Sequence, residues 1–246
     1  MKKLFIILYL LGCYILNAGA QYTQQGKIEF ERKINIHRRI EELDEDDRRF
    51  YDKIKSQLAK YHVTYFDMYF GKDKTIYKPG RETENASRWL STPAPENVVY
   101  TDFKTDSVTA QKVIFEDKFL VRDSMRVLKW RITDEIRTIA NYKCRKAVSK
   151  ICDSVYVVAF YTDDIMVNGG PEMFSGLPGM ILEVAIPRLY TTWIATKIEL
   201  VQPKEEDYKF SQKGKKVNSK ELYESMSKSM EDWKEYGPRN IWWTTL

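Results

Sequence analysis

The sequence predicts a β-dominated α+β fold, in which a strongly curved antiparallel sheet or half-barrel carries a helix near each end of the chain. Three observations lead to this prediction. Many short segments alternate apolar and polar residues, two segments with helical spacing lie toward the ends, and one glycine- and proline-rich segment interrupts the series of strands. We expect the helices to lie against the concave side of the sheet.

Residues 1–20 have the organisation of a secretory signal peptide. Lys2 and Lys3 precede an apolar stretch that runs to Leu16, and Ala18-Gly19-Ala20 supplies a cleavage site of small residues. We therefore expect export across the inner membrane to the periplasm or the cell surface.

A lipoprotein is the alternative, because Leu11-Gly12-Cys13 resembles a lipobox with Cys13 as the lipidated residue. The apolar run continues past Cys13, which favours the cleaved signal peptide. In that case residues 21–246 form a single domain, a size that β-rich domains commonly reach.

The charge balance argues against binding to nucleic acid. Removal of residues 1–20 takes away two lysines and no acid, so the net charge falls from +5 to +3. Such a surface lacks a basic footprint. No apolar stretch in the mature chain approaches the ~20 residues of a membrane-spanning helix, so no transmembrane segment is expected.

The two remaining cysteines give conflicting indications. An oxidising compartment favours a disulfide between Cys144 and Cys152. Residues 142–151 also have the pattern of an unbroken strand, which would separate the two by roughly 26 Å. A disulfide requires Cα atoms within about 7 Å. The sequence leaves both outcomes open.

The first part of the chain predicts a strand, a helix and a hairpin. Residues 26–37 place Ile28, Phe30, Arg32, Ile34 and Ile36 on one, mostly apolar face. Residues 39–61 have helical spacing, with a break around 44–47. A hairpin of 63–70 with 74–78 follows, and then a polar loop over 79–96.

A series of short strands is expected next, separated by turn residues. Near the end, a capped helix is expected to begin at Ser219 and to end at Gly237-Pro238, and the aromatic tail 240–243 is expected to pack back on the body. The expected strands are 98–102, 107–115, 119–123, 127–133, 137–139, 143–151, 155–162, 180–186 and 191–201.

The segment from Gly169 to Gly179 concentrates glycine and proline. Such a composition specifies a backbone shape, because glycine reaches angles that other residues avoid and proline fixes φ. We interpret it as a rigid loop that covers the open end of the sheet and leads into a central strand. Alternatively it forms a ligand-binding rim lined by Phe174, Leu177 and Met180. The structural motif of this segment, which we expect to fix its backbone shape, consists of Gly170, Pro171, Gly176, Leu177, Pro178 and Gly179.

No catalytic motif is present, so we expect no catalytic residue and no cofactor. The alternative is a hydrolase that uses the carboxylates of Asp163, Asp164 and Glu172, although neighbouring residues of a strand point to opposite faces.

A second alternative is a metal-handling protein with a soft site. It would use Cys144 together with methionines, for which Met166, Met173 and Met180 are the candidates. Methionine is more simply an adaptable filler of the core, so no metal ligands are assigned.

Three segments resemble the GLPGLI family of secreted proteins from Bacteroidota. They are Asn141 to Ala147, Phe160 to Ile165, and Gly170 to Leu182, which contains Gly176-Leu177-Pro178-Gly179-Met180-Ile181. Trp130, Thr133 and Ile139 precede these segments, at positions where that family tends to have Trp, Thr and Ile. Met180 replaces its second leucine, Phe160 stands where it usually has Trp, and Cys152 is an extra cysteine. The resemblance covers about residues 128–200.

The resemblance implies an envelope protein of a Gram-negative bacterium and brings no established ligand or mechanism with it. It also makes three Asp-Ser-apolar triplets candidates for O-glycosylation, at Ser107, Ser124 and Ser154, although Asp-Ser is also common in turns. We expect a non-enzymatic envelope protein that binds a lipid or other apolar ligand, or a partner protein of outer-membrane transport or envelope biogenesis.

Overall fold

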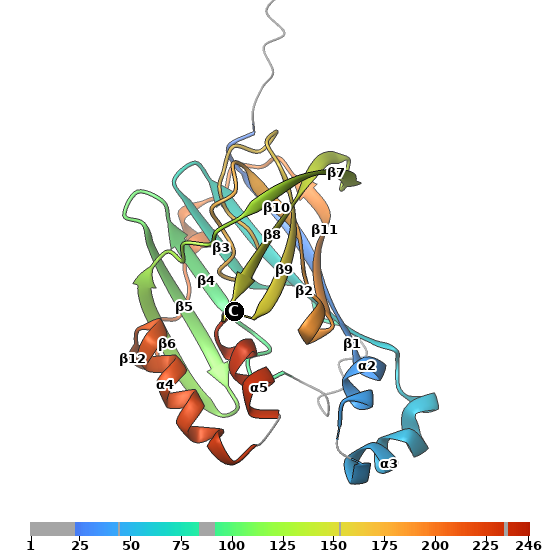
Figure 1. Ribbon diagram of the computed structural model, residues 1–246. Coiled ribbons are helices and arrows are strands. Elements are labelled where there is room, and N and C mark those ends of the chain that lie inside the picture. Colours follow the sequence, from blue (N-terminus) through green and yellow to red (C-terminus); the bar gives the residue numbers. More distant parts are fainter. Residues whose placement is uncertain (1–22, 44, 84–91, 153, 234–235) are drawn as a thin grey trace, which may run out of the picture.

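The computed structural model describes residues 23–43, 45–83, 92–152, 154–233 and 236–246. The signal-peptide interpretation of 1–20 and the lipobox at Cys13 lie outside these residues. One large antiparallel sheet dominates the described chain, which confirms the β-dominated α+β class (Figure 1). Its strands are β1 (Gly26–Asn35), β2 (Tyr61–Gly71), β3 (Lys74–Pro79), β4 (Val98–Asp102), β5 (Ser107–Ile114), β6 (Asp117–Ser124), β7 (Arg131–Ile139), β8 (Tyr142–Ile151), β9 (Val155–Thr162), β10 (Met180–Ile186), β11 (Thr191–Glu199) and β12 (Lys215–Val217).

The sheet consists of two meanders that are joined at β1. The strand order is β12-β6-β5-β4-β3-β2-β1-β11-β10-β9-β8-β7, so β1 to β6 form one meander and β7 to β11 the other. Antiparallel pairing of β1 with β11 connects them, and the short β12 adds to β6 in parallel. The sheet is open, with β12 and β7 at its edges.

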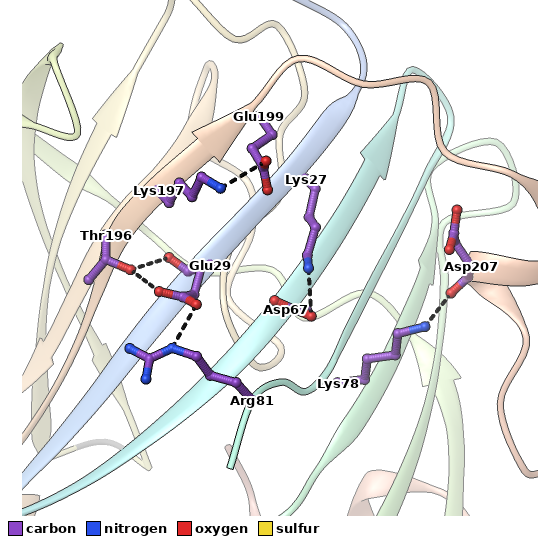
Figure 2. A network of polar contacts seen from close by, with 9 residues as sticks. All are labelled: Lys27, Glu29, Asp67, Lys78, Arg81, Thr196, Lys197, Glu199 and Asp207. Carbon is purple, nitrogen blue, oxygen red and sulfur yellow. Dashed lines mark hydrogen bonds and ion pairs between the residues drawn. The ribbon is translucent and has the colours of Figure 1, made fainter. Parts of the chain in front are cut away.

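Alternation along the strands separates a buried face from a solvated one. In β5 the buried positions are Val108, Ala110, Lys112 and Ile114, while the residues between them are half-exposed. The solvated face carries ion pairs beside β1, as Figure 2 shows: Lys27 with Asp67 of β2, and Glu29 with Arg81, which follows β3. The opposite charges on this part of the face therefore neutralise one another in pairs.

The helices lie at two separate places. The helix α4 (Ser219–Ser229) packs against β6 and β12, and the helix α5 (Tyr236–Thr244) packs against α4 (Figure 1). The helices α2 (Ile36–Glu41) and α3 (Glu45–Ile54) continue from the end of β1 and project beyond the sheet. The expected position on the concave side therefore holds for the C-terminal helices and is wrong for α2 and α3. Short 3-10 turns occupy Lys55–Gln57, Pro187–Leu189, Glu205–Tyr208 and Glu231–Trp233.

The predicted C-terminal helix is correct at its start and wrong at its end. Asn218 and Glu221 form a reciprocal capping box at the start of α4. The helix ends at Ser229, and Gly237-Pro238 lies in the first turn of α5, where a proline is tolerated because its missing N–H has no partner in a helix. The aromatic tail packs on the body, with the Trp243 ring 5.9 Å from that of Trp193.

The glycine- and proline-rich segment adopts the imposed shape that its composition predicts. Gly179 has φ +145°, and a Cβ there would lie 2.0 Å from the main-chain oxygen of Thr162. The segment leads into β10, which has the predicted bounds and lies between β9 and β11.

The two cysteines of the described residues, Cys144 and Cys152, are unpaired. Cys144 is buried in β8, and Cys152 is exposed directly after the same strand. The strand interpretation of residues 142–151 is therefore correct. Within the described ranges, no helix is long and apolar enough to span a membrane.

Candidate functional site

Two groups of buried polar residues lie inside the curved sheet. The first surrounds Glu172, which the glycine- and proline-rich segment carries at φ +53° and which is 3% exposed. The side-chain amide of Asn97 donates a hydrogen bond of 2.8 Å to Glu172 Oε2, and Arg32 Nη1 lies 4.0 Å from Oε1. We call Arg32, Tyr77, Asn97 and Glu172 the central cluster.

Arg32 occupies an inward position of β1, between Phe30 and Ile34. Its Nε donates to Thr64 Oγ1 at 3.0 Å, and its Nη2 donates to the main-chain oxygen of Pro95 at 2.8 Å. The guanidinium also lies 4.6 Å from the centre of the Phe66 ring. Burial lowers the pKa of Arg32, while Tyr77 and Glu172 raise it in part. Arg32 is thus held on several sides.

The central cluster retains unpaired polar atoms. Burial, followed by the charge of Glu172, raises the pKa of Tyr77 well above its usual value. Within the described residues, six buried atoms of this region complete no hydrogen bond: Arg32 Nη1, Tyr77 OH, Asn97 Oδ1, Glu172 Oε1, Trp193 Nε1 and Trp243 Nε1. Because the residues that carry these atoms are each at most 3% exposed, the cluster is a closed core of charge and dipoles.

The second group lines a cavity of about 380 Å³ between α4, α5 and the sheet, which we call the basic pocket. Strands from opposite parts of the sheet order meet here, β5 and β6 with β8, so the sheet curls around the pocket. Its apolar wall consists of Val121, Val127, Leu128, Ile151, Met173 and Leu222.

Four cations line the basic pocket: Lys112, Arg126, Lys150 and Lys220. Within the described structure, no acidic side chain lines it. Arg126 Nη2 donates to the main-chain oxygen of Thr245, and burial lowers the pKa of Arg126. The pocket is therefore apolar in its walls and positive in its charge.

Lys112 is the most unusual of these residues, because it is 1% exposed at an inward position of β5. Its Nζ donates to the main-chain oxygen of Thr244 at 2.9 Å and to that of Leu246. Burial lowers the pKa of Lys112 to about 8, with Glu172 raising it and Arg126 lowering it. Lys112 is thus compensated by two main-chain oxygens at and just after the end of α5.

A further hollow of about 370 Å³ lies between α2 and α5 and contains Arg39 and Arg239. Here Arg239 forms an ion pair with Glu42, which also accepts a hydrogen bond from Tyr190. Burial, then Arg239, lowers the pKa of Arg39 to about 10. Glu42 thus neutralises the charge of Arg239 in this hollow.

The residues proposed as a ligand rim lie in the core. Phe174, Leu177 and Met180 are each at most 2% exposed, and none of them lines the basic pocket. Met173, their neighbour in the same segment, does line it. The segment therefore reaches the pocket through Met173.

The structure does not bring together the carboxylates of the hydrolase alternative. Asp163 and Asp164 are exposed, whereas Glu172 is buried in the central cluster.

The residues of the metal-site alternative differ in exposure. Across the described ranges, no group of at least three His, Cys, Asp or Glu residues is placed to hold a metal ion. Burial raises the pKa of Cys144 to about 12, and its thiol donates to the main-chain oxygen of Tyr142. Met173 and Met180 are buried, and Met166 is exposed.

The candidate O-glycosylation sites differ in exposure. Ser124 and Ser154 are exposed, while Ser107 is half-buried at the start of β5 and pairs with Thr105 Oγ1 at 2.8 Å. Glycosylation of these serines stays a prediction.

Sequence reasoning missed Lys112 and Arg126, which both contact main-chain oxygens of residues 244–246. A signal was nevertheless present for Lys112, because it interrupts the apolar alternation of Val108, Ala110 and Ile114. Arg32 interrupts the buried face of β1 in the same way.

Comparison with known proteins yields one family and a set of similar folds. A family model described as a protein of unknown function (Porph_ging) matches residues 148–183, inside the stretch that resembles the GLPGLI family. No curated protein matches the chain.

Two solved structures of PNGF-II, in space groups P21 and C2, are similar in fold. Their TM-scores are 0.54 and 0.52, with 16% and 15% sequence identity over 84% and 89% of this chain. The chain spans about a third of the length of those proteins, 34% and 33% respectively. At this identity the likeness establishes a shared fold, and the function has to be argued from the site.

Proposed function

We propose that this protein is a binding protein, which holds an apolar ligand in the basic pocket. The observation that carries the proposal is a cavity of about 380 Å³ whose wall is formed by six apolar side chains under α4 and α5. Ligand sites are typically concave and mostly apolar, with a few polar groups that fix orientation, and begin at about 300 Å³.

The construction of the pocket supports this proposal. Its wall combines residues from β6, the 125–130 connection, β8, the glycine- and proline-rich segment and α4. Val127 is 92% exposed beside the half-buried Leu128, so apolar surface reaches the mouth of the cavity. Burial of that surface by a ligand would be favourable by roughly 25 cal/mol per Å².

We further propose that the protein works in the cell envelope. Residues 1–20 would direct export, residues 21–246 would form the single binding domain, and the partners would belong to outer-membrane transport or envelope biogenesis. The signal-peptide pattern and the resemblance of residues 128–200 to a secreted family support this location.

Substitution of Leu128 by Trp tests the site of binding. Leu128→Trp fills the cavity from a connection that is not part of a strand, and Leu200→Trp is its control, since Leu200 is an exposed leucine after β11. Titration with the fluorescent probe N-phenylnaphthylamine should show saturable binding by the natural chain and by Leu200→Trp. We expect Leu128→Trp to weaken it about tenfold, a change of ~1.4 kcal/mol. Absence of saturable binding, or equal binding by both variants, would contradict the proposal.

A further inference from the structure

We propose that the ligand of the basic pocket is a single-chain amphiphile with an anionic head group, a carboxylate or a phosphate. The head group would lie on Lys112 and Arg126, and the chain would follow the apolar wall. This inference rests on the proposed function and adds the chemical class of the ligand to it.

The charges of the pocket carry the inference. Lys112 is buried and Arg126 is half-buried, and the two are close enough for Arg126 to lower the pKa of Lys112. Lys150 and Lys220 line the same cavity, and among its described lining residues none is acidic. Burial of a cation is unfavourable unless it is paired, and no acidic side chain is among the described lining residues, so an anion that enters this cavity is attracted by Lys112 and Arg126.

The groups that now contact the two cations are main-chain oxygens of residues 244–246. Lys112 Nζ donates to the main-chain oxygens of Thr244 and Leu246, and Arg126 Nη2 donates to that of Thr245. An ammonium and a guanidinium carry more N–H donors than these bonds use, and hydrogen bonds to a charged acceptor are stronger. A carboxylate or phosphate would therefore join or displace the oxygens of residues 244–246.

The surrounding titratable groups agree with this assignment. Glu172, the acid that raises the pKa of Lys112, belongs to the central cluster with Asn97 and Arg32. Cys152 also lines the basic pocket, and its thiol lies 3.8 Å from Thr245 Oγ1. The pocket thus offers an anion several cations and no competing carboxylate among its described lining residues.

Calorimetry with four compounds tests the head group and the chain separately. The compounds are dodecanoate, dodecyl phosphate, dodecanol and inorganic phosphate. We expect the two dodecyl anions to bind at least about tenfold more tightly than dodecanol and than inorganic phosphate. Equal binding of dodecanol would overturn the anionic head group and leave the apolar pocket standing. Equal binding of inorganic phosphate would overturn the amphiphile, and no binding of any dodecyl compound would overturn the proposed function as well.

Three substitutions locate the head group. Lys112→Met and Arg126→Met should each abolish the preference for dodecanoate over dodecanol, whereas Arg122→Met should retain it, because Arg122 is exposed and donates to Gln212. Retention of the preference in both Lys112→Met and Arg126→Met would place the head group elsewhere and overturn the inference.

The natural chain gives a measurement that requires no core substitution. Above about pH 8 Lys112 loses its proton in the free protein, while dodecanoate stays ionised. Affinity for dodecanoate should therefore fall between about pH 7 and about pH 9.5, and affinity for dodecanol should not. A constant ratio of the two affinities would contradict the role of Lys112.

The exposed Cys152 provides a second readout of the location. In a chain carrying Cys13→Ser, a thiol reagent should modify Cys152 rapidly and the buried Cys144 slowly. Bound dodecanoate should slow the modification of Cys152. An unchanged rate at saturating dodecanoate would show that the ligand binds outside the basic pocket.

Discussion

The central cluster and the basic pocket both bury a cation on an inward position of a strand, but they compensate its charge differently. Arg32 in β1 has a carboxylate, Glu172, together with Thr64 and the main-chain oxygen of Pro95. Lys112 in β5 has main-chain oxygens at the end of α5. The first cation lies in a closed core, and the second faces a cavity.

This difference separates a structural charge from one that is available to a ligand. Each partner of a buried ion pair depends on the other, so the removal of one partner is felt mainly in stability. A buried cation that contacts main-chain oxygens and retains an unused N–H donor can still gain from a further, negatively charged acceptor. The account therefore assigns stability to the central cluster and binding to the basic pocket.

Removal of the carboxylate from the central cluster should have the largest effect. Glu172→Gln keeps the shape and leaves Arg32 buried without its acid, so we expect a loss of about 3 to 5 kcal/mol in the free energy of unfolding. Urea denaturation measures it. A loss below about 1 kcal/mol would show that Arg32 does not depend on Glu172.

Substitution of Lys112 should change the pH dependence of stability rather than abolish folding. The folded-state pKa of Lys112 is about 8, below the 10.5 of the unfolded chain. The unfolded chain therefore binds more protons between these values, and Lys112 lowers stability most below about pH 8. Relative to Lys112→Met, the ligand-free natural chain should gain up to about 3 kcal/mol as the pH rises from 8 to 10.5.

Parallel stability curves for Lys112→Met and the natural chain over that range would contradict this prediction. Urea denaturation at a series of pH values gives the comparison. Arg122→Met, an exposed position, should follow the natural chain throughout.

The smallest effect is expected at an ion pair of the exposed surface, which gives the scale for the two buried sites. Lys74 Nζ lies 2.8 Å from Glu205 Oε1, and Glu205 is mostly exposed. Glu205→Gln should cost less than about 1 kcal/mol, because water and salt screen the pair. A loss comparable with that of Glu172→Gln would remove the distinction between buried and exposed charges.

The sequence predicted the strands better than the site, for a physical reason. Alternation is local, so β9 and β10 have the predicted bounds, 155–162 and 180–186. Gly237-Pro238 was misleading because proline is acceptable in the first turn of a helix as well as after its end.

The basic pocket depends on contacts between distant parts of the chain. Lys112 belongs to β5, Arg126 to the connection after β6, and the oxygens they contact to residues 244–246. Only the curl of the sheet and the packing of α5 bring these groups together. The charged residue among apolar positions of β5 indicated a special environment, but it did not indicate which groups share it.

A crystal structure of the protein with dodecanoate that carries bromine at its chain end tests the central claim most directly. The account predicts an anomalous bromine signal against the apolar wall near Leu128 and Leu222, with the carboxylate at hydrogen-bond distance from Lys112 or Arg126. A bromine signal only outside the basic pocket, or a carboxylate that turns away from both cations, would contradict it.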